Sequence, residues 1–345
     1  MNEDSAGKAP LRLSVLDQSP VSEGSSGPEA LRNSVDLARL ADRLGYHRYW
    51  IAEHHGTPML ASPSPEALIG PIAAATEAIR VGSGGVMLPH YSPVKVAETF
   101  SMFAGLFPGR IDLGLGRAPG SDQRTAYALQ RDRRHAAPDD FPDQLVELLG
   151  YLEGTIPPDH PFAALAELPG RPHAPEPHLL GSSLQSALWA GQLDLPYVFA
   201  DFINAEGAPI AARYRAELAD RHPGARARTI VAVWAIAAET DAAAERLAAS
   251  HRMAMTLFRR GRLIRIPPVE AALAFLAGEG ETAVPFGPGR RRVVGSPERV
   301  KAGLEAVAAE YGAEEVMVVT ITHEHAARRR SYELLAEGFG LAARG

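Results

Sequence analysis

The sequence of 345 residues contains no cysteine, and lysine occurs only three times. Without cysteine the chain cannot form disulfides, thiolate metal sites or a cysteine nucleophile, and nothing in it requires an oxidising compartment. It also has no apolar run long enough to cross a membrane. Its first ten residues are polar and lack the basic, apolar and small-residue order of a signal peptide. We therefore expect a cytoplasmic protein without membrane association.

Positive charge is not in excess, because 41 acidic residues outnumber 35 lysines and arginines and give a net charge of -6. The arginines are scattered among acidic residues, so no basic stripe indicates nucleic-acid binding. A hydrophobic fraction of 46% and a charged fraction of 22% are typical of a globular protein with a large core. The excess of arginine over lysine and the abundance of alanine are typical of a GC-rich genome.

Short apolar segments, many of them β-branched, alternate along the chain with patterns of helical period. The predicted strands are residues 11–17, 47–52, 80–88, 110–115, 178–180, 196–200, 229–238 and 315–320. The predicted helices are residues 28–44, 65–78, 93–107, 183–192, 209–221, 241–259, 297–311 and 326–339.

The predicted strands are apolar on both faces, as residues 231–236 illustrate, which is typical of a parallel sheet covered by helices. Eight strand–helix units predict a (β/α)8 barrel, the TIM-barrel fold. The rival is an open doubly wound sheet, but residues 17–20, Asp-Gln-Ser-Pro, stand where its glycine-rich turn would be. We expect a single barrel domain from residue 11 to residue 345, preceded by a flexible N-terminus of residues 1–10.

Two stretches interrupt the regular alternation. Residues 154–177 are rich in proline and histidine, and residues 261–295 carry several glycines and three consecutive arginines. Long irregular insertions in a compact domain are usually functional lids or disordered segments. We expect both insertions to cover the C-terminal mouth of the barrel.

A carboxylate and two imidazoles, Glu53, His54 and His55, directly follow the second predicted strand. Barrel enzymes carry their chemistry at the C-terminal ends of the strands, and histidine changes protonation near neutral pH. The alternatives are a solvated turn without a role and a metal site. Adjacent residues at a strand end point in alternate directions, so three of them rarely converge on one ion, and we expect no metal.

Three glycines, Gly82, Gly84 and Gly85, lie inside the third predicted strand. Glycine weakens a strand, so its presence indicates either a β-bulge or the close approach of a ligand to the backbone. A flat cofactor lying against this strand would explain the pattern. A bulge without a ligand is the other interpretation.

Two further features indicate an anion site. Arg117 follows the fourth predicted strand, where a guanidinium can bind phosphate or simply form a salt bridge. Serines open the helix after the fifth strand, and the N–H groups at a helix N-terminus bind anions. Ordinary N-capping by serine is equally compatible with this pattern. In a barrel, successive strand ends share one rim, so both features can hold one phosphate.

The chain resembles the luciferase-like flavin monooxygenases, the family of bacterial luciferase, over most of its length. The segments that carry the resemblance are residues 50–55 (WIAEHH), 80–89 (RVGSGGVMLP), 108–120 (PGRIDLGLGRAPG) and 179–183 (LLGSS). The resemblance implies a (β/α)8 barrel that binds reduced FMN at its C-terminal mouth. It also implies that O2 is activated on the flavin and that an organic substrate is oxygenated.

The resemblance also implies roles for individual residues. His54 matches the catalytic histidine, whose role is proton transfer beside the flavin, and Glu53 and His55 would support it. Gly84 and Gly85 match the position of a non-proline cis peptide facing the flavin ring. The residues that match the phosphate-binding positions are Arg117, Ser182, Ser183 and Ser186. Gly116 stands where luciferase itself has a reactive cysteine, so aldehyde luminescence is not implied.

We therefore expect an FMN-dependent monooxygenase that receives reduced FMN from a separate flavin reductase, because no nicotinamide-binding turn is visible. The GC-rich composition hints at an actinobacterial source and so at a secondary metabolite, such as an aromatic polyketide, as substrate. The alternatives are an F420-dependent hydride-transfer oxidoreductase of the same fold and a non-catalytic partner subunit. Helices 65–78 and 93–107 form the dimer interface in the resembled family, so we expect a homodimer.

Overall fold

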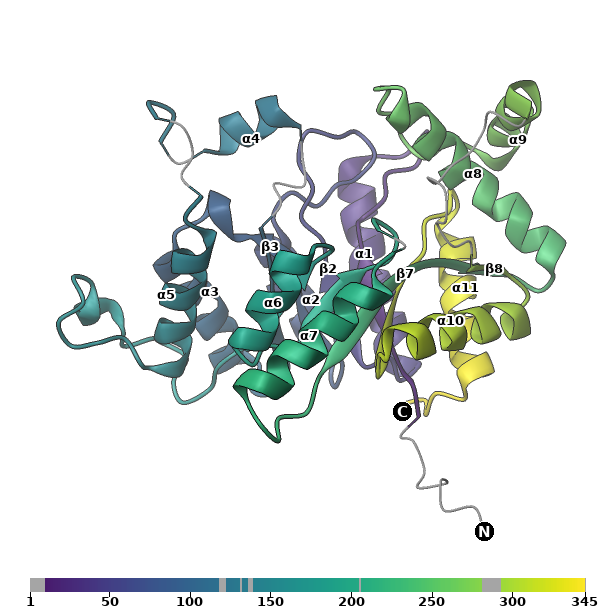
Figure 1. Ribbon diagram of the computed structural model, residues 1–345. Helices are drawn as coiled ribbons and strands as arrows, with labels where there is room; N and C mark the ends of the chain where they lie inside the picture. The colour runs from purple at the N-terminus through teal and green to yellow at the C-terminus, as the bar shows by residue number, and fades with distance from the viewer. Residues whose placement is uncertain are drawn as a thin grey trace, which may run out of the picture.

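The computed structural model describes residues 10–117, 122–130, 132–135, 139–204, 206–280 and 293–344. Within these residues, eight parallel strands close into a barrel with helices on its outside (Figure 1). The strands of the barrel are β1 (Arg12–Asp17), β2 (Arg48–Ile51), β3 (Arg80–Met87), β4 (Ile111–Gly116), β5 (Glu176–Gly181), β6 (Tyr197–Ala200), β7 (Thr229–Ala237) and β9 (Glu315–Val319). The predicted (β/α)8 barrel is confirmed.

The barrel closes because β6 pairs with β7 and β9 lies between β7 and β1, every pair being parallel. A short ninth strand, β8 (Val293–Gly295), pairs with β7. The helices are α1 (Gly27–Arg43), α2 (Pro65–Ala74), α3 (Pro93–Leu106), α4 (Gln123–Leu129), α5 (Phe141–Glu153), α6 (Leu184–Gln192), α7 (Ala208–Arg221), α8 (Asp241–Arg259), α9 (Val269–Glu279), α10 (Pro297–Tyr311) and α11 (His325–Phe339).

The strands are buried on both faces, as their apolar sequences predicted. All nine residues of β7 are buried, which requires helices outside the barrel and side chains filling its interior. Helix α1 is an example of a helix that covers the barrel with one apolar face. Its buried residues include Ala30, Leu37 and Ala41, which share that face. Pro28 lies in the first turn of α1, where its missing N–H leaves no hydrogen bond unmade.

The expectation that residues 154–177 cover the mouth is wrong. Helix α5, which was not predicted, follows β4 and runs back toward the start of β5, so the segment after it lies at the N-terminal end of the barrel. Gly170 N–H donates to Ser101 Oγ at 2.9 Å, and Arg171 Nη2 donates to the Tyr151 carbonyl at 2.9 Å. The segment is thereby attached to α3 and α5 on the outside of the barrel.

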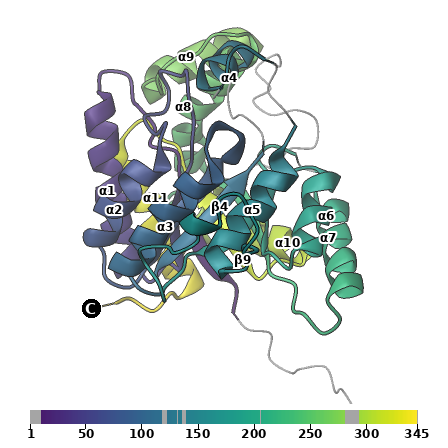
Figure 2. The same cartoon turned by 90° about the vertical axis from the view of Figure 1, so that its left-hand side faces the viewer.

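The second insertion does lie at the mouth. Helices α8 and α9 stand at the top of the molecule, where α4 also lies (Figures 1 and 2). Backbone hydrogen bonds join Ile266 to Val21 and Glu23 in the loop after β1. Much of the insertion is therefore regular, whereas residues 281–292 lie outside the described residues, as do residues 1–9 of the expected flexible N-terminus. None of the helices in the described ranges is long and apolar enough to cross a membrane.

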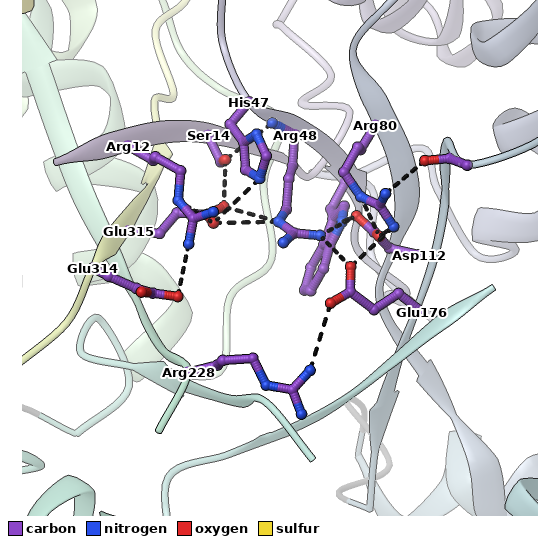
Figure 3. A network of polar contacts seen from close by, with 12 residues as sticks. Arg12, Ser14, His47, Arg48, Arg80, Asp112, Glu176, Arg228, Glu314 and Glu315 are labelled. Atoms are coloured by element: carbon purple, nitrogen blue, oxygen red, sulfur yellow. Dashed lines mark hydrogen bonds and ion pairs between the residues drawn. The ribbon is translucent and has the colours of Figure 1, made fainter. Parts of the chain in front are cut away.

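The N-terminal end of the barrel, which we call the floor, is closed by a network of buried ion pairs (Figure 3). Arg48 on β2 lies 2.8 Å from Asp112 on β4 and 3.1 Å from Glu315 on β9. Arg80 Nε donates to Asp112 at 2.8 Å, and so does Nε1 of Trp50. Charges from four strands thus neutralise one another beneath the barrel interior.

Candidate active site

A cavity of about 470 Å³ lies at the C-terminal ends of the strands, the end of a (β/α)8 barrel where active sites are built. All eight strands of the barrel contribute to its lining. The contributing strand residues include Leu16, Trp50, Gly84, Gly85, Met87, Gly116, Leu180, Gly181, Val198, Ala200, Ala232 and Met317. The walls are mainly apolar, so the few polar groups among them decide what the cavity can bind.

One wall of the cavity is bare backbone from β3. The peptide bond between Gly84 and Gly85 is cis, and the register with β4 shifts at this point. The predicted β-bulge is therefore present, and the two glycines also form a wall of the cavity, which we call the glycine wall. A Cβ atom on Gly85 would lie 2.8 Å from the Gly114 carbonyl oxygen, and one on Gly84 would lie 2.5 Å from Leu16. Side chains are therefore excluded here, and the backbone is left open to a flat ligand.

His54 lines the cavity just beyond β2, as its position in the sequence predicted. Its backbone N–H donates to the Ser62 carbonyl at 2.9 Å, which fixes the chain at this point. Its Nδ1 atom is buried and has no hydrogen-bond partner among the described residues. Burial, and secondarily the neighbouring His55, lowers the pKa of His54 to about 4. The imidazole is therefore neutral near pH 7 and free to hydrogen-bond a ligand in the cavity.

Glu53 and His55 lie beside His54 and contact each other. Glu53 is only 2% exposed, and its carboxyl Oε1 lies 2.9 Å from Nε2 of His55. The other oxygen, Oε2, accepts a hydrogen bond of 3.0 Å from the backbone N–H of Met87. Burial raises the pKa of the Glu53 carboxyl. Within the described ranges, no group of three or more acidic or histidine side chains is placed to hold a metal ion.

The residues predicted to bind phosphate line the same cavity, just after β4 and β5. Arg117 follows β4, where its guanidinium pairs with Asp139 at 2.8 Å and lies 5.6 Å from the ring centre of Trp189. Its side chain is 47% exposed. A salt bridge thus holds the guanidinium at the rim, where it remains accessible to an anion.

The serines begin α6 after β5, the strand that neighbours β4. Ser183 is the N-cap residue, and its Oγ accepts a hydrogen bond from the Ser186 N–H at 3.3 Å. Ser186 Oγ donates to the Ser183 carbonyl at 2.8 Å, and the Ser182 carbonyl accepts from Asn204 Nδ2 at 3.2 Å. Ordinary N-capping is therefore present. It coexists with a helix N-terminus that opens on the cavity.

Several lining residues were not identified from the sequence. They include Gln18 after β1, Phe202 and Ile203 after β6, and Trp189 on α6. The first three directly follow barrel strands, so the rule that located His54 and Arg117 would have found them. Trp189 had no comparable signal, because its place in the wall depends on the angle at which α6 packs.

The chain matches the luciferase-like monooxygenase family over residues 11–315. It is 40% identical over 331 residues to a luciferase-like monooxygenase of Escherichia coli, with 94% of this chain and 96% of that protein covered. It is 36% identical over 334 residues to the N-acetyl-S-alkylcysteine monooxygenase of Bacillus subtilis, with 97% and 100% covered. The chain therefore belongs to the luciferase-like monooxygenase family.

Solved structures agree with this assignment. The structure of apo-MsnO8 has a TM-score of 0.85 and 41% sequence identity, and the match covers 97% of this chain and 100% of that chain. More distant structures show the fold alone. They include the oxygenating constituent of the 3,6-diketocamphane monooxygenase of Pseudomonas putida in complex with FMN, at 20% identity and a TM-score of 0.71 with 95% and 98% covered. Another is an F420-dependent secondary alcohol dehydrogenase, at 13% identity and a TM-score of 0.62, with 94% of this chain and 99% of that chain covered.

Proposed function

We propose that this protein is a monooxygenase that uses reduced FMN and O2 to oxygenate an organic substrate. One observation carries the proposal: a single cavity joins a bare glycine wall, a half-buried histidine with a lowered pKa, and a rim formed by Arg117 and the N-terminus of α6. A flat cofactor that carries a phosphate and reacts with transfer of a proton would require these three features. Membership of the luciferase-like monooxygenase family supports the same conclusion.

The residues of the cavity fit FMN in a definite orientation. The guanidinium of Arg117 and the N–H groups at the start of α6 would hold the phosphate, with Ser182, Ser183 and Ser186 beside it. The backbone at Gly84 and Gly85 would lie against the isoalloxazine, because no side chain intervenes there. Reduced flavin supplies the electrons that activate O2, and the protein supplies position and surroundings.

His54 would transfer a proton at the reacting centre. Its imidazole is neutral near pH 7, and the buried Nδ1 atom has no partner among the described residues, so a hydrogen bond to a bound ligand would satisfy it. A positioned imidazole typically contributes about 100-fold to 10,000-fold to a rate through proton transfer. The retention of both His54 and Arg117 in the cavity argues against a non-catalytic partner subunit.

The reduced flavin would come from a separate reductase. The sequence has no glycine-rich turn after its first strand, the place where a nicotinamide-binding domain would have one. The cavity must therefore admit reduced FMN from solution. We propose a flavin reductase as the functional partner, with free reduced FMN as the carrier between the two proteins.

The substrate would be an apolar organic compound, and an aromatic polyketide or a similar secondary metabolite is our first candidate. Trp50, Trp189 and Phe202 line the cavity, and aromatic walls favour flat apolar ligands. The 36% identical relative named as an N-acetyl-S-alkylcysteine monooxygenase supports thioethers as a second class. Incorporation of ¹⁸O from ¹⁸O2 into either class of compound would decide between them.

We also propose that the protein forms a homodimer through α2 and α3. Met102 and Leu106 on α3 are 55% and 68% exposed, which is unusual for large apolar side chains adjacent to each other on one helix. Sedimentation of wild type and of the double variant Met102→Glu and Leu106→Glu would test this. The wild type should sediment as a dimer and the variant as a monomer.

F420-dependent hydride transfer is the second candidate function, since an enzyme of that kind shares the fold. An anaerobic titration with reduced FMN and with reduced F420, followed by admission of O2, separates the two. We expect reduced FMN to bind and then to be consumed by O2. Binding of F420 alone, without reaction with O2, would replace the proposal with the second candidate.

A further inference from the structure

Glu53 connects the cavity with a polar cluster that reaches solvent. It belongs to the cavity lining together with His54. Its Oε1 atom lies 2.9 Å from Nε2 of His55, while Oε2 accepts the hydrogen bond from Met87 N–H. The side chain of His55 is 13% exposed. Two side chains in hydrogen-bond contact thus extend from the cavity wall to an imidazole that water can reach.

Ionisable groups face Glu53 from each of the neighbouring segments. These groups are His54 and His55 in its own segment, Glu66 in the first turn of α2, and Tyr91 after β3, while His90 packs edge-on against His55. Burial raises the pKa of the Glu53 carboxyl, the contacts to His55 and Met87 oppose the rise, and the charge of Glu66 adds to it. Burial and the carboxylates of Glu53 and Glu66 raise the pKa of Tyr91.

A merely structural link between β2 and β3 does not require an ionisable side chain. An amide oxygen would accept the hydrogen bond from Met87 equally well, without the free-energy cost of burying an acid. Buried acids beside a cavity, in contact with a histidine, are typical of proton-transfer sites. His54 is poorly suited to store a proton, because its pKa is about 4.

We propose that Glu53 and His55 form a proton-sharing pair that carries protons from solvent into the cavity, where His54 transfers a proton at the reacting centre. This rests on the proposed function, because it requires a reaction in the cavity that takes up a proton. The Glu53 carboxyl releases its proton to an acceptor in the cavity. His55 passes its Nε2 proton to the Glu53 carboxylate and takes up another from solvent at Nδ1. Exchange with solvent restores the tautomer, so one proton has crossed and the pair is unchanged.

The pair is tested first in the protein without flavin. Infrared difference spectra between wild type and Glu53→Gln isolate the C=O band of the protonated Glu53 carboxyl. We expect this band to persist above the ordinary glutamate pKa of 4.5 and to disappear at higher pH. In the control variant Glu66→Gln the band should disappear at lower pH, because the charge that raises the pKa of Glu53 is gone. Absence of the band from about pH 5 upward in wild type would overturn the proposal.

The second test measures O2 consumption by the protein loaded with reduced FMN. Glu53→Gln and His55→Gln keep polar groups of similar size but cannot pass the proton. We expect the dissociation constant of reduced FMN to stay within about twofold of the wild-type value and the rate of O2 consumption to fall by about 100-fold. The wild-type rate should decline at high pH, and this decline should be absent from both variants. Glu66→Gln should keep the rate and move that decline to lower pH.

Wild-type rates with an unchanged pH profile in Glu53→Gln or His55→Gln would overturn the proposal. If Glu53→Gln does not fold, His55→Gln alone decides the matter. If wild type does not bind reduced FMN, the proposed function fails. The infrared titration would then still show whether Glu53 holds a proton, so the two failures can be distinguished.

Discussion

The charged residues at the floor of the barrel and His54 at its mouth are used in opposite ways. At the floor, Arg48, Asp112 and Glu315 are buried and pair with one another across the strands (Figure 3). At the mouth, the Nδ1 atom of His54 is buried without a partner among the described residues. A cavity of about 450 Å³ also opens at the floor, but paired charges line much of it. Groups that satisfy one another stabilise the fold, whereas groups left unsatisfied are available to a ligand.

Trp50 links the two ends physically. Its indole lines the mouth cavity, while its Nε1–H donates to Asp112 in the floor network at 2.8 Å. His178 packs edge-on against the indole with ring centres 4.9 Å apart. Trp50 is therefore a side chain that both ends share. The comparison predicts that changes at the mouth affect chemistry with little loss of stability, and that changes at the floor do the reverse.

The largest effect is expected for His54→Ala. Loss of the imidazole should slow the reaction of bound reduced FMN with O2 by about 100-fold to 10,000-fold, because the group that transfers the proton at the reacting centre is gone. The dissociation constant of reduced FMN and the unfolding temperature should change little. Stopped-flow absorbance of the flavin measures the rate. A variant that reacts at the wild-type rate would show that His54 is only part of the wall.

The second effect concerns the floor. Asp112→Ala leaves Arg48, Arg80 and the indole N–H of Trp50 without their shared acceptor, and breaking a buried ion pair in this way costs about 3–5 kcal/mol. Urea denaturation should show a corresponding decrease in the free energy of unfolding. The exposed pair between Arg117 and Asp139 is the control. Asp139→Ala should cost at most about 1 kcal/mol. Equal losses in the two variants would contradict the assigned role of the floor.

A smaller effect is expected for Arg117→Ala. Loss of one charged hydrogen-bonding group should weaken the binding of reduced FMN by about 1.5–3 kcal/mol, while the rate of the bound complex with O2 stays near that of wild type. Fluorescence titration under anaerobic conditions measures the binding. Riboflavin, which lacks the phosphate, is the matched ligand control and should bind both proteins equally. If riboflavin binding is lost as well, Arg117 supports the fold of the rim and not the phosphate.

The smallest effect is a difference in pH dependence between Asp112 at the floor and Glu53 at the mouth. Burial alone would raise the pKa of Asp112, but Arg48 and the other cations around it lower the pKa below 3.8, so its stabilising contribution is complete above that pH and is lost as the pH falls below it. The pKa of Glu53 is raised above 4.5, so its contribution is complete below that pH and is lost as the pH rises through the folded value. Denaturation of wild type, Asp112→Asn and Glu53→Gln across pH would reveal opposite slopes.

Most of the barrel and much of the site could be predicted from the sequence, because apolar strands and the residues that follow them carry a local signal. His54, Arg117 and the serines were placed at one rim by that rule, and they line one cavity. Helix α5 carried such a signal too, since Leu145, Leu148 and Leu152 share its buried face, and its omission misplaced residues 154–177.

The floor network could not be predicted in the same way. Arg48, Asp112 and Glu315 belong to strands that are far apart in the sequence, and their pairing depends on the order in which the barrel closes. The contact between Glu53 and His55 also depends on the path of the chain after β2. Local patterns indicate which residues reach each end of the barrel. They do not indicate which side chains form ion pairs or hydrogen bonds with one another there.

The most direct test of the comparison is the increase in unfolding free energy that reduced FMN produces in wild type and in Asp112→Ala. A ligand that binds the folded protein at a concentration of 100 times its dissociation constant adds about 2.7 kcal/mol. We predict this increase in both proteins under anaerobic conditions, although the variant starts from a lower stability. No increase in wild type, or an increase that disappears in Asp112→Ala, would contradict the account that the mouth binds the flavin and the floor stabilises the fold.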